Sequence, residues 1–349
     1  MTVRTPLMAL LLLAACGGNP FGAKPSGGSG GIIPGNPSVS DLPGTTNPTA
    51  TGSIARSEDK NKGPDGAVAG NGFAQGISYN AANDTFTVDN LAFDGGNVYA
   101  RDTVMPTVGP AQAYKAASTY ADSQTGALID QFSYRALYGV SKTGRTSFAI
   151  VRTGSYIPYG FGGFVYNRNG GVTLPTSGQA KYTGTFAGLR DFNGVPGDQP
   201  KLEYTTADVN MAIDFNDFNP AESATGNGAG IQAIVSNRRV FDLSGNDITA
   251  NVVAGINKDR SLTTNPLFAL PSLNFTVGPG VLDNNGEAQG TLTSTAPTNT
   301  GTFSVLEAGK YYAVISGTNA DEVVGIIVVT STVNSVLTRE TGGFILYRP

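Results

Sequence analysis

The sequence predicts a nearly all-β protein, in which an irregular antiparallel sheet precedes a small antiparallel barrel of about eight strands. Apolar residues alternate with polar residues in short runs, which is the period of a strand with one buried face. Turn residues separate the runs, as at Asn169-Gly170-Gly171 and Asn284-Asn285-Gly286. No long stretch carries an apolar stripe of helical period with capping residues at its ends.

The composition excludes several classes of function. The 349 residues include no histidine and one cysteine, and the formal net charge of the chain is −4. Ser-His-Asp and Cys-His catalysis and His-ligated zinc or haem all require an imidazole, and a disulfide or iron–sulfur cluster requires more cysteines. A mildly acidic chain is also a poor nucleic-acid binder. We therefore expect a protein without a cofactor and without nucleic-acid partners.

Residues 1–15 are predicted to be a secretory signal peptide. Arg4 gives the start a positive charge, Leu7–Ala15 is almost continuously apolar, and this run is too short to span a bilayer. Leu13-Ala14-Ala15-Cys16 resembles the lipobox of bacterial lipoproteins, which implies cleavage before Cys16 and lipidation of its sulfur. The alternative is a buried core helix, which Gly17 and Gly18 disfavour because they stop the segment. Their presence, in place of an aspartate after the cysteine, points to the outer membrane.

The next two segments differ in composition. Residues 16–66 are rich in Gly, Pro, Ser, Thr and Asn, so they are predicted to form a flexible tether from the lipid. Residues 67–171 are predicted to form the irregular sheet, with alternating strands at Thr85–Asn90 and Gln131–Val140. Residues 111–121 contain helix-favouring alanines, but their tyrosines alternate, so a strand is expected there too.

Residues 172–349 carry the most regular alternation and are predicted to form the barrel. Val323–Thr330 is almost entirely apolar, which predicts a strand buried on both faces between the barrel interior and a second sheet. The expected strands are Gly178–Leu189, Asp208–Phe215, Gly230–Ser236, Leu273–Val277, Ala288–Thr293, Lys310–Ser316, Val323–Thr330 and Gly343–Tyr347.

Aromatic residues gather in Ser155–Gly171, where glycines lie between the rings. Tyr and Arg are common at protein-binding hot spots, so an exposed loop here would be a docking surface, with tyrosine ligation of iron or haem as a further possibility. The alternative is that the rings pack the first region against the barrel. The candidate binding residues are Tyr156, Tyr159, Phe161 and Arg168.

Three acidic stretches are candidate chemical sites. Asp214 and Asp217 could form a catalytic carboxylate pair, but solvated acids at a strand end are the simpler interpretation. Asp242–Ile248 and Asp283–Glu287 place oxygen ligands beside a glycine. Neither matches a full calcium loop, so ordinary turns are expected there.

Two segments carry a family resemblance over roughly residues 172–349. Leu174–Gly188 (LPTSGQAKYTGTFAG) resembles the opening barrel strand of the transferrin-binding protein B and factor H binding protein family of surface lipoproteins. The glycine-led GGFILYRP at residues 342–349 is similar to the closing strand of that family. The resemblance implies a handle-like sheet domain at 67–171 before the barrel, present here once. No residue matches the family's partner-contacting surface.

The resulting functional hypothesis is a lipid-anchored, outward-facing and non-enzymatic binding protein of the outer membrane. Its partner would be a protein or an iron-bearing ligand, with an outer-membrane transporter as a further candidate partner. The alternative is a transmembrane β-barrel or a structural envelope protein, although the Arg348-Pro349 ending lacks the terminal aromatic residue common in such barrels. A hydrolase ranks last because histidine is absent.

Overall fold

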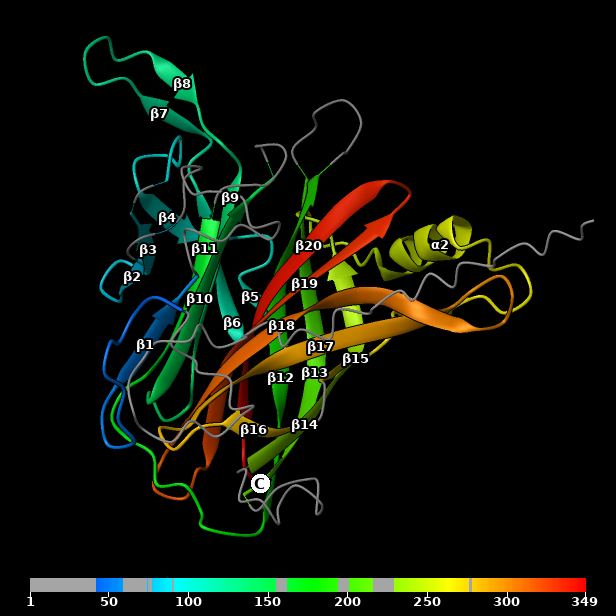
Figure 1. Ribbon diagram of the computed structural model, residues 1–349. Coiled ribbons are helices and arrows are strands. Elements are labelled where there is room, and N and C mark those ends of the chain that lie inside the picture. Colours follow the sequence, from blue (N-terminus) through cyan, green and yellow to red (C-terminus); the bar gives the residue numbers. More distant parts are fainter. Residues whose placement is uncertain are drawn as a thin grey trace, which may run out of the picture.

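The computed structural model describes residues 42–58, 74, 77–89, 91–154, 162–193, 201–215, 229–275 and 278–349. These residues form a curled antiparallel sheet, a closed antiparallel barrel, a projecting two-stranded arm and one α-helix (Figure 1). The fold class predicted from the alternation of apolar residues is confirmed.

The first sheet has the strand order β1-β11-β10-β9-β6-β4-β3-β2, and β5 pairs with β6. Several of its short strands bury alternate residues; in β3, for example, Phe86 and Val88 are buried and Thr85 and Thr87 are half-buried. The bounds are β1 Ile54–Ser57, β2 Ile77–Asn80, β3 Thr85–Val88, β4 Val98–Arg101, β5 Thr107–Val108, β6 Ala111–Ala116, β9 Tyr134–Val140, β10 Thr146–Thr153 and β11 Gly162–Arg168.

The arm consists of β7 (Thr119–Ala121) and β8 (Leu128–Asp130), which pair only with each other. It leaves the first sheet after β6, so the strand expected over residues 111–121 is in fact two strands in different sheets. Figure 1 shows the arm extending beyond the rest of the first sheet.

The barrel closes because β12 pairs with β13 on one side and with β20 on the other. β15 and β16 both lie between β14 and β17, so the wall has eight strand positions. The bounds are β12 Gln179–Asn193, β13 Leu202–Asp214, β14 Ala229–Phe241, β15 Leu273–Phe275, β16 Gly278–Leu282, β17 Glu287–Pro297, β18 Phe303–Ser316, β19 Glu322–Val333 and β20 Val336–Tyr347.

Side chains fill the barrel interior, and a second apolar layer joins the barrel to the first sheet. Strand β19 contributes to both layers: Val323 and Ile327 point into the barrel, whereas Val324 and Ile326 pack against the first sheet. The prediction that Val323–Thr330 is buried on both faces is therefore confirmed.

The glycines of the closing strand allow the two layers to approach each other. A Cβ atom at Gly343 would overlap the ring of Phe148, which β10 presents to the barrel. A Cβ atom at the preceding Gly342 would overlap the ring of Phe186 inside the barrel. Each glycine thus leaves room for one phenylalanine ring, one on each side of the wall.

Two features differ from the sequence prediction. The predicted tether, residues 16–66, includes Ile54–Ser57, which forms the edge strand β1 because Ile54 and Arg56 are buried against the folded body. A helix, α2 (Thr249–Asp259), follows β14, buries Val253 and Ile256, and packs Ile256 against Ala296 and Leu306 at one end of the barrel. The signal peptide, Cys16 and tether positions 17–41 and 59–66 lie outside the described residues, whereas 42–58 belong to the folded body.

Candidate functional site

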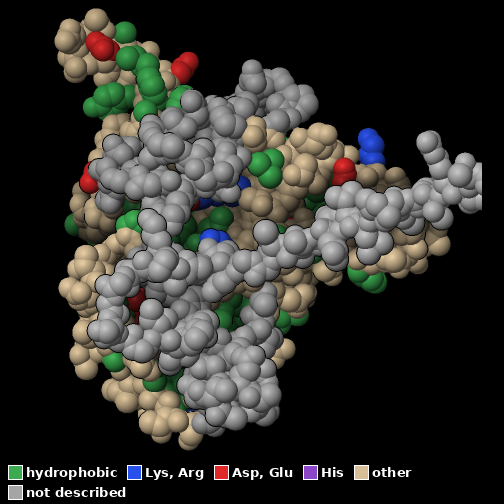
Figure 2. Space-filling view, viewed as in Figure 1, with side chains coloured by type: hydrophobic (Ala, Val, Ile, Leu, Met, Phe, Trp, Pro, Cys, Tyr) green, Lys and Arg blue, Asp and Glu red, His purple; other side chains and the backbone are tan. Residues whose placement is uncertain are grey.

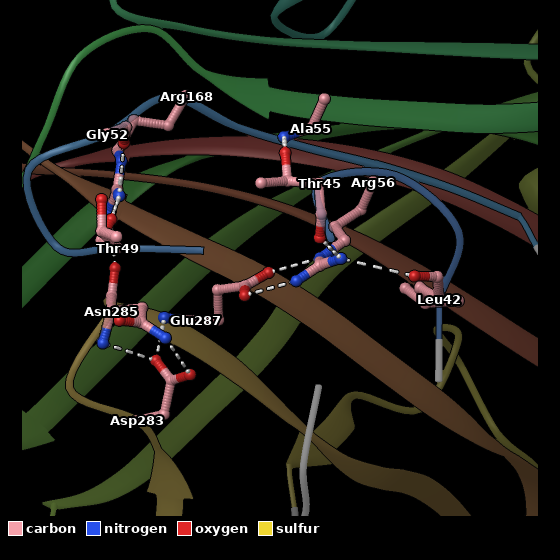
Figure 3. A network of polar contacts seen from close by, with 10 residues as sticks. All are labelled: Leu42, Thr45, Thr49, Gly52, Ala55, Arg56, Arg168, Asp283, Asn285 and Glu287. Atoms are coloured by element: carbon pink, nitrogen blue, oxygen red, sulfur yellow. Dashed lines mark hydrogen bonds and ion pairs between the residues drawn. The ribbon is translucent and has the colours of Figure 1, made fainter. Parts of the chain in front are cut away.

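A buried ion pair joins the first sheet to the barrel. Arg56 of β1 donates from Nε and Nη2 to the two carboxylate oxygens of Glu287 of β17, at 2.6 and 2.7 Å (Figure 3). Their side chains are 4% and 1% exposed. The hydrogen bond to Glu287 raises the pKa of Arg56, against the opposing effect of burial. The pair therefore fixes β1 on the barrel.

Arg168 lies beside this pair and is fully buried. Its guanidinium donates to five backbone carbonyl oxygens, three of them in the turn before β17 and the segment before β1 (Figure 3). The acceptors are Gly170, Asn285, Ile315, Thr49 and Gly52, at 2.8–3.0 Å. The predicted role of Arg168 on a docking surface is therefore corrected: burial leaves it no surface to offer a partner.

The neighbouring aromatic residues of β11 are buried as well. Phe164 and Tyr166 are 4% and 1% exposed and belong to the layer between sheet and barrel. Phe164 stacks on Tyr312 of β18 with 6.0 Å between ring centroids. Phe164 and Tyr166 therefore pack the first sheet against the barrel, which was the alternative to a docking surface. The other candidate binding residues, Tyr156, Tyr159 and Phe161, lie outside the described residues.

The arm exposes several large apolar side chains. Tyr120 and Ile129 face each other across the two strands and are 51% and 42% exposed, and Leu128 is 73% exposed. Phe93, 55% exposed, comes from the loop on which the base of the arm rests. Figure 2 shows hydrophobic and acidic side chains together on this projection. Residues 118–131 include Asp122 and Asp130 and no Lys or Arg.

A layer of charged side chains covers the apolar core at one end of the barrel. Arg190 of β12 has the inward parity of Phe186 and lies in register between Glu203 of β13 and Glu340 of β20. The β-bulge between β13 and β14 turns Arg238 toward the same level, because a bulge reverses the alternation that follows it. We call Arg190, Glu203, Arg238, Glu307 and Glu340 the charged layer.

Ion pairs neutralise most of the charged layer. Arg238 binds both oxygens of Glu307 at 2.6 and 2.8 Å and one oxygen of Glu340 at 2.9 Å. Burial alone would raise the pKa of Glu307, but attraction to Arg238 outweighs it, so the pKa lies below its ordinary value of 4.5. Burial would likewise lower the pKa of Arg238, and the two glutamates raise it instead. Arg238 and Glu307 therefore remain ionised at neutral pH.

A cavity of about 690 Å³ lies between the charged layer and α2. Val252 and Ile256 of α2 and Leu306 of β18 give it apolar walls, together with Phe192 at the end of β12. Arg190 and Lys201 both reach the carboxylate of Glu203, at 2.6 and 3.2 Å, and both lie over the ring of Phe192. The mouth of a barrel is a common place for a small-molecule site.

The three acidic stretches that were candidate chemical sites form ordinary local structure where the structure describes them. Asp242 and Asp283 each accept hydrogen bonds from backbone N–H groups of their own turns, as expected. Asp214 is 7% exposed and accepts from Gln179 at 2.8 Å, so it is not the solvated acid that was expected; Asp217 lies outside the described residues. Across the described part of the chain, no group of three or more His, Cys, Asp or Glu side chains is placed to hold a metal ion.

No helix among the described residues has the length and hydrophobicity needed to cross a bilayer.

No known protein-family model and no curated protein matches this sequence. Among solved structures, the chain is similar to a double mutant of transferrin-binding protein B from Haemophilus parasuis Hp5, with 11% identity and a TM-score of 0.33 over 78% of this chain and 45% of that one. Isotype 1 transferrin-binding protein B from serogroup B Neisseria meningitidis gives 16% identity and a TM-score of 0.30 over 67% and 36%. A putative outer membrane protein from Bacteroides fragilis has 10% sequence identity and a TM-score of 0.22, over 85% of this chain and 88% of that one. The chain spans less than half the length of the first two proteins, and its function is inferred here from its own residues.

Proposed function

We propose that this chain is a lipid-anchored, non-enzymatic binding protein of the outer membrane that faces outward and holds a protein partner on its arm. The observation that carries the proposal is the exposed apolar surface of the arm, formed by Tyr120, Leu128 and Ile129. Tyr120 and Ile129 lie on one face of the arm and Leu128 on the other, because successive residues of a strand point to opposite faces. Exposed apolar groups on a projecting element lose their contact with water only when a partner covers them, and aromatic residues are frequent anchors at such interfaces.

The charge of the arm indicates what kind of surface it contacts. Asp122 and Asp130 flank its apolar residues, and residues 118–131 contain no cation. A partner surface with apolar groups surrounded by Lys or Arg would be complementary. If the cargo is iron-bearing, we propose that the partner carries the metal to this chain, with an outer-membrane transporter as the receiver.

The barrel wall favours this proposal over a transmembrane barrel. On β12 the outward residues Lys181, Thr183 and Thr185 are exposed and polar, whereas Tyr182 and Phe186 point inward and are buried. Membrane-spanning barrels have the reverse alternation, with apolar residues toward lipid. This part of the wall therefore suits water.

The first test concerns the anchor. Cys16→Ser is expected to abolish incorporation of an alkyne-labelled palmitate into the full chain and to prevent removal of residues 1–15, because the sulfur that receives the lipid is gone. Gel fluorescence and intact-protein mass measure both effects, and Gly17→Ala serves as the matched control that keeps them. Label that persists in Cys16→Ser would contradict the anchor. Digestion of the wild-type chain by protease added to intact cells, with a periplasmic control protein spared, tests the outward facing.

The second test concerns the arm. A photo-crosslinking amino acid at Leu128 of the full chain is expected to yield a discrete protein adduct on intact cells. Ile129→Asp, on the same arm, is expected to lower its yield about tenfold or more, the effect of losing a hot-spot contact. Phe303→Asp is the matched control, because Phe303 is 70% exposed on the barrel strand β18. Equal adducts from crosslinkers at Leu128 and Phe303, or an adduct insensitive to Ile129→Asp, would refute the arm as the binding surface.

A further inference from the structure

We propose that the cavity between the charged layer and α2 binds a small amphipathic anion, such as a long-chain carboxylic acid. The apolar body would lie against α2, and the carboxylate would lie at Arg190 and Lys201. This site is separate from the arm, so it stands or falls independently of the protein-binding role.

The size and walls of the cavity suit an apolar body. Its volume of about 690 Å³ falls within the range of roughly 300–1,000 Å³ that small-molecule sites occupy. Val252, Ile256 and Leu306 line it, and α2 contacts β14 and β19 across the end of the barrel. A ligand placed there would cover apolar groups that the fold leaves beside an open space.

The distribution of charge selects an anionic head. Arg238 is matched by two carboxylates, Glu307 and Glu340, whereas Arg190 and Lys201 share the single carboxylate of Glu203. The excess of positive charge is therefore confined to the side of Arg190 and Lys201, where an anionic head would lie. On the other side Arg238 faces two carboxylates, and Asp242 also lines the cavity.

The two cations also retain donors for a ligand. Arg190 uses only Nη1, to Glu203, for hydrogen bonds to the described residues. Lys201 is 47% exposed and contacts Glu203 at 3.2 Å, which leaves ammonium hydrogens directed elsewhere. Both lie over the ring of Phe192, 5.4 and 4.3 Å from its centroid, which holds them side by side. A carboxylate accepting from both would form charge-assisted hydrogen bonds.

Gly255 offers a way to fill the cavity without disturbing its charges. It lies on α2 and lines the cavity, and a Cβ atom there would meet only Nδ2 of Asn334, at 4.0 Å. Gly255→Ala should therefore leave the cavity open, whereas the ring of Gly255→Phe should occupy it.

The test uses the lipidated full chain in nanodiscs and two photoreactive probes of equal length, a palmitic acid and the corresponding alcohol, each with a diazirine in the tail. Mass spectrometry of peptides maps the adducts, which are expected in α2 and near Val333 and Val336. Gly255→Phe should lower labelling of these peptides about tenfold, whereas Gly255→Ala should not. Lys201→Met should lower labelling by the acid about tenfold and leave labelling by the alcohol unchanged, because only the charged head loses a partner.

Thermal unfolding of each variant shows that it is folded before it is labelled. The proposal is overturned if adducts form only outside the cavity or if Gly255→Phe labels as strongly as Gly255→Ala. It is also overturned if Lys201→Met affects acid and alcohol equally. None of these outcomes bears on the arm, whose test has its own readout.

Discussion

Glu287→Ala is expected to destabilise the protein by about 3–5 kcal/mol, because it leaves the Arg56 guanidinium buried without its carboxylate. Arg56 is 3% exposed, so water cannot replace the lost partner. Urea unfolding followed by circular dichroism measures the loss as a lower midpoint. Asp130→Ala is the matched control, since Asp130 is an exposed acid on the arm and its removal should change stability by less than about 0.5 kcal/mol.

The double variant Arg56→Met, Glu287→Met separates the charge from the packing. It is expected to be more stable than either single variant, because apolar groups of similar volume leave no unpaired charge in the interface. Since the pair joins β1 to β17, we also expect Glu287→Ala to unfold the first sheet at a lower denaturant concentration than the barrel. If either single variant had the same urea midpoint as the wild type, the ion pair would contribute nothing to the contact between β1 and the barrel.

Arg238→Met is expected to lower the free energy of unfolding by about 3–5 kcal/mol at pH 7, because it leaves the carboxylates of Glu307 and Glu340 inside the barrel without their cation. The neighbouring Arg239 gives a matched control: it is 59% exposed and paired with Asp247 at the surface, so Arg239→Met should cost about 0–1 kcal/mol. Unfolding of both variants by urea at pH 7 measures the contrast. Similar losses in the two variants would contradict the role of the charged layer.

The pH dependence of Arg238→Met should have the opposite sign to that of the wild type. In the wild type the pKa of Glu307 is lowered below 4.5, so its stabilisation is present above pH 4.5 and is lost as the pH falls through the lower, folded-state value. Without Arg238, burial is left to raise the pKa of Glu307. The stability difference between variant and wild type should therefore shrink as the pH falls from 7 toward 4.5, and a constant difference would contradict this account.

The strands could be predicted from the sequence because their burial follows the chain with a period of two. In β13, for example, Val209, Met211 and Ile213 point into the barrel as expected. The joining of the sheets could not be predicted in the same way. Arg56 and Glu287 are 231 positions apart, and no local pattern records which distant carboxylate an arginine meets.

Helix α2 was missed because its residues are poor helix formers. Thr249–Asp259 (TANVVAGINKD) contains β-branched residues, asparagines and a glycine, and the residue at its N-cap is Ile248, which has no capping side chain. Its stability comes from packing Ile256 against Ala296 and Leu306, which are distant in sequence. The charged layer is only weakly indicated in the sequence: Arg190 and Glu203 occupy positions of their strands that point into the barrel, where apolar residues are usual.

The pairing of β12 with β20 sets the order in which this protein can acquire its native structure. Thr183 pairs with Tyr347, and Asn193 with Leu337, so the barrel cannot close until the residues of β20 have been synthesised. The first sheet likewise gains its anchoring contact only when Glu287 is available to Arg56. Ring closure over such long loops is slow. A chain still attached to the ribosome therefore lacks a closed barrel, and its native structure forms only after translation of β20.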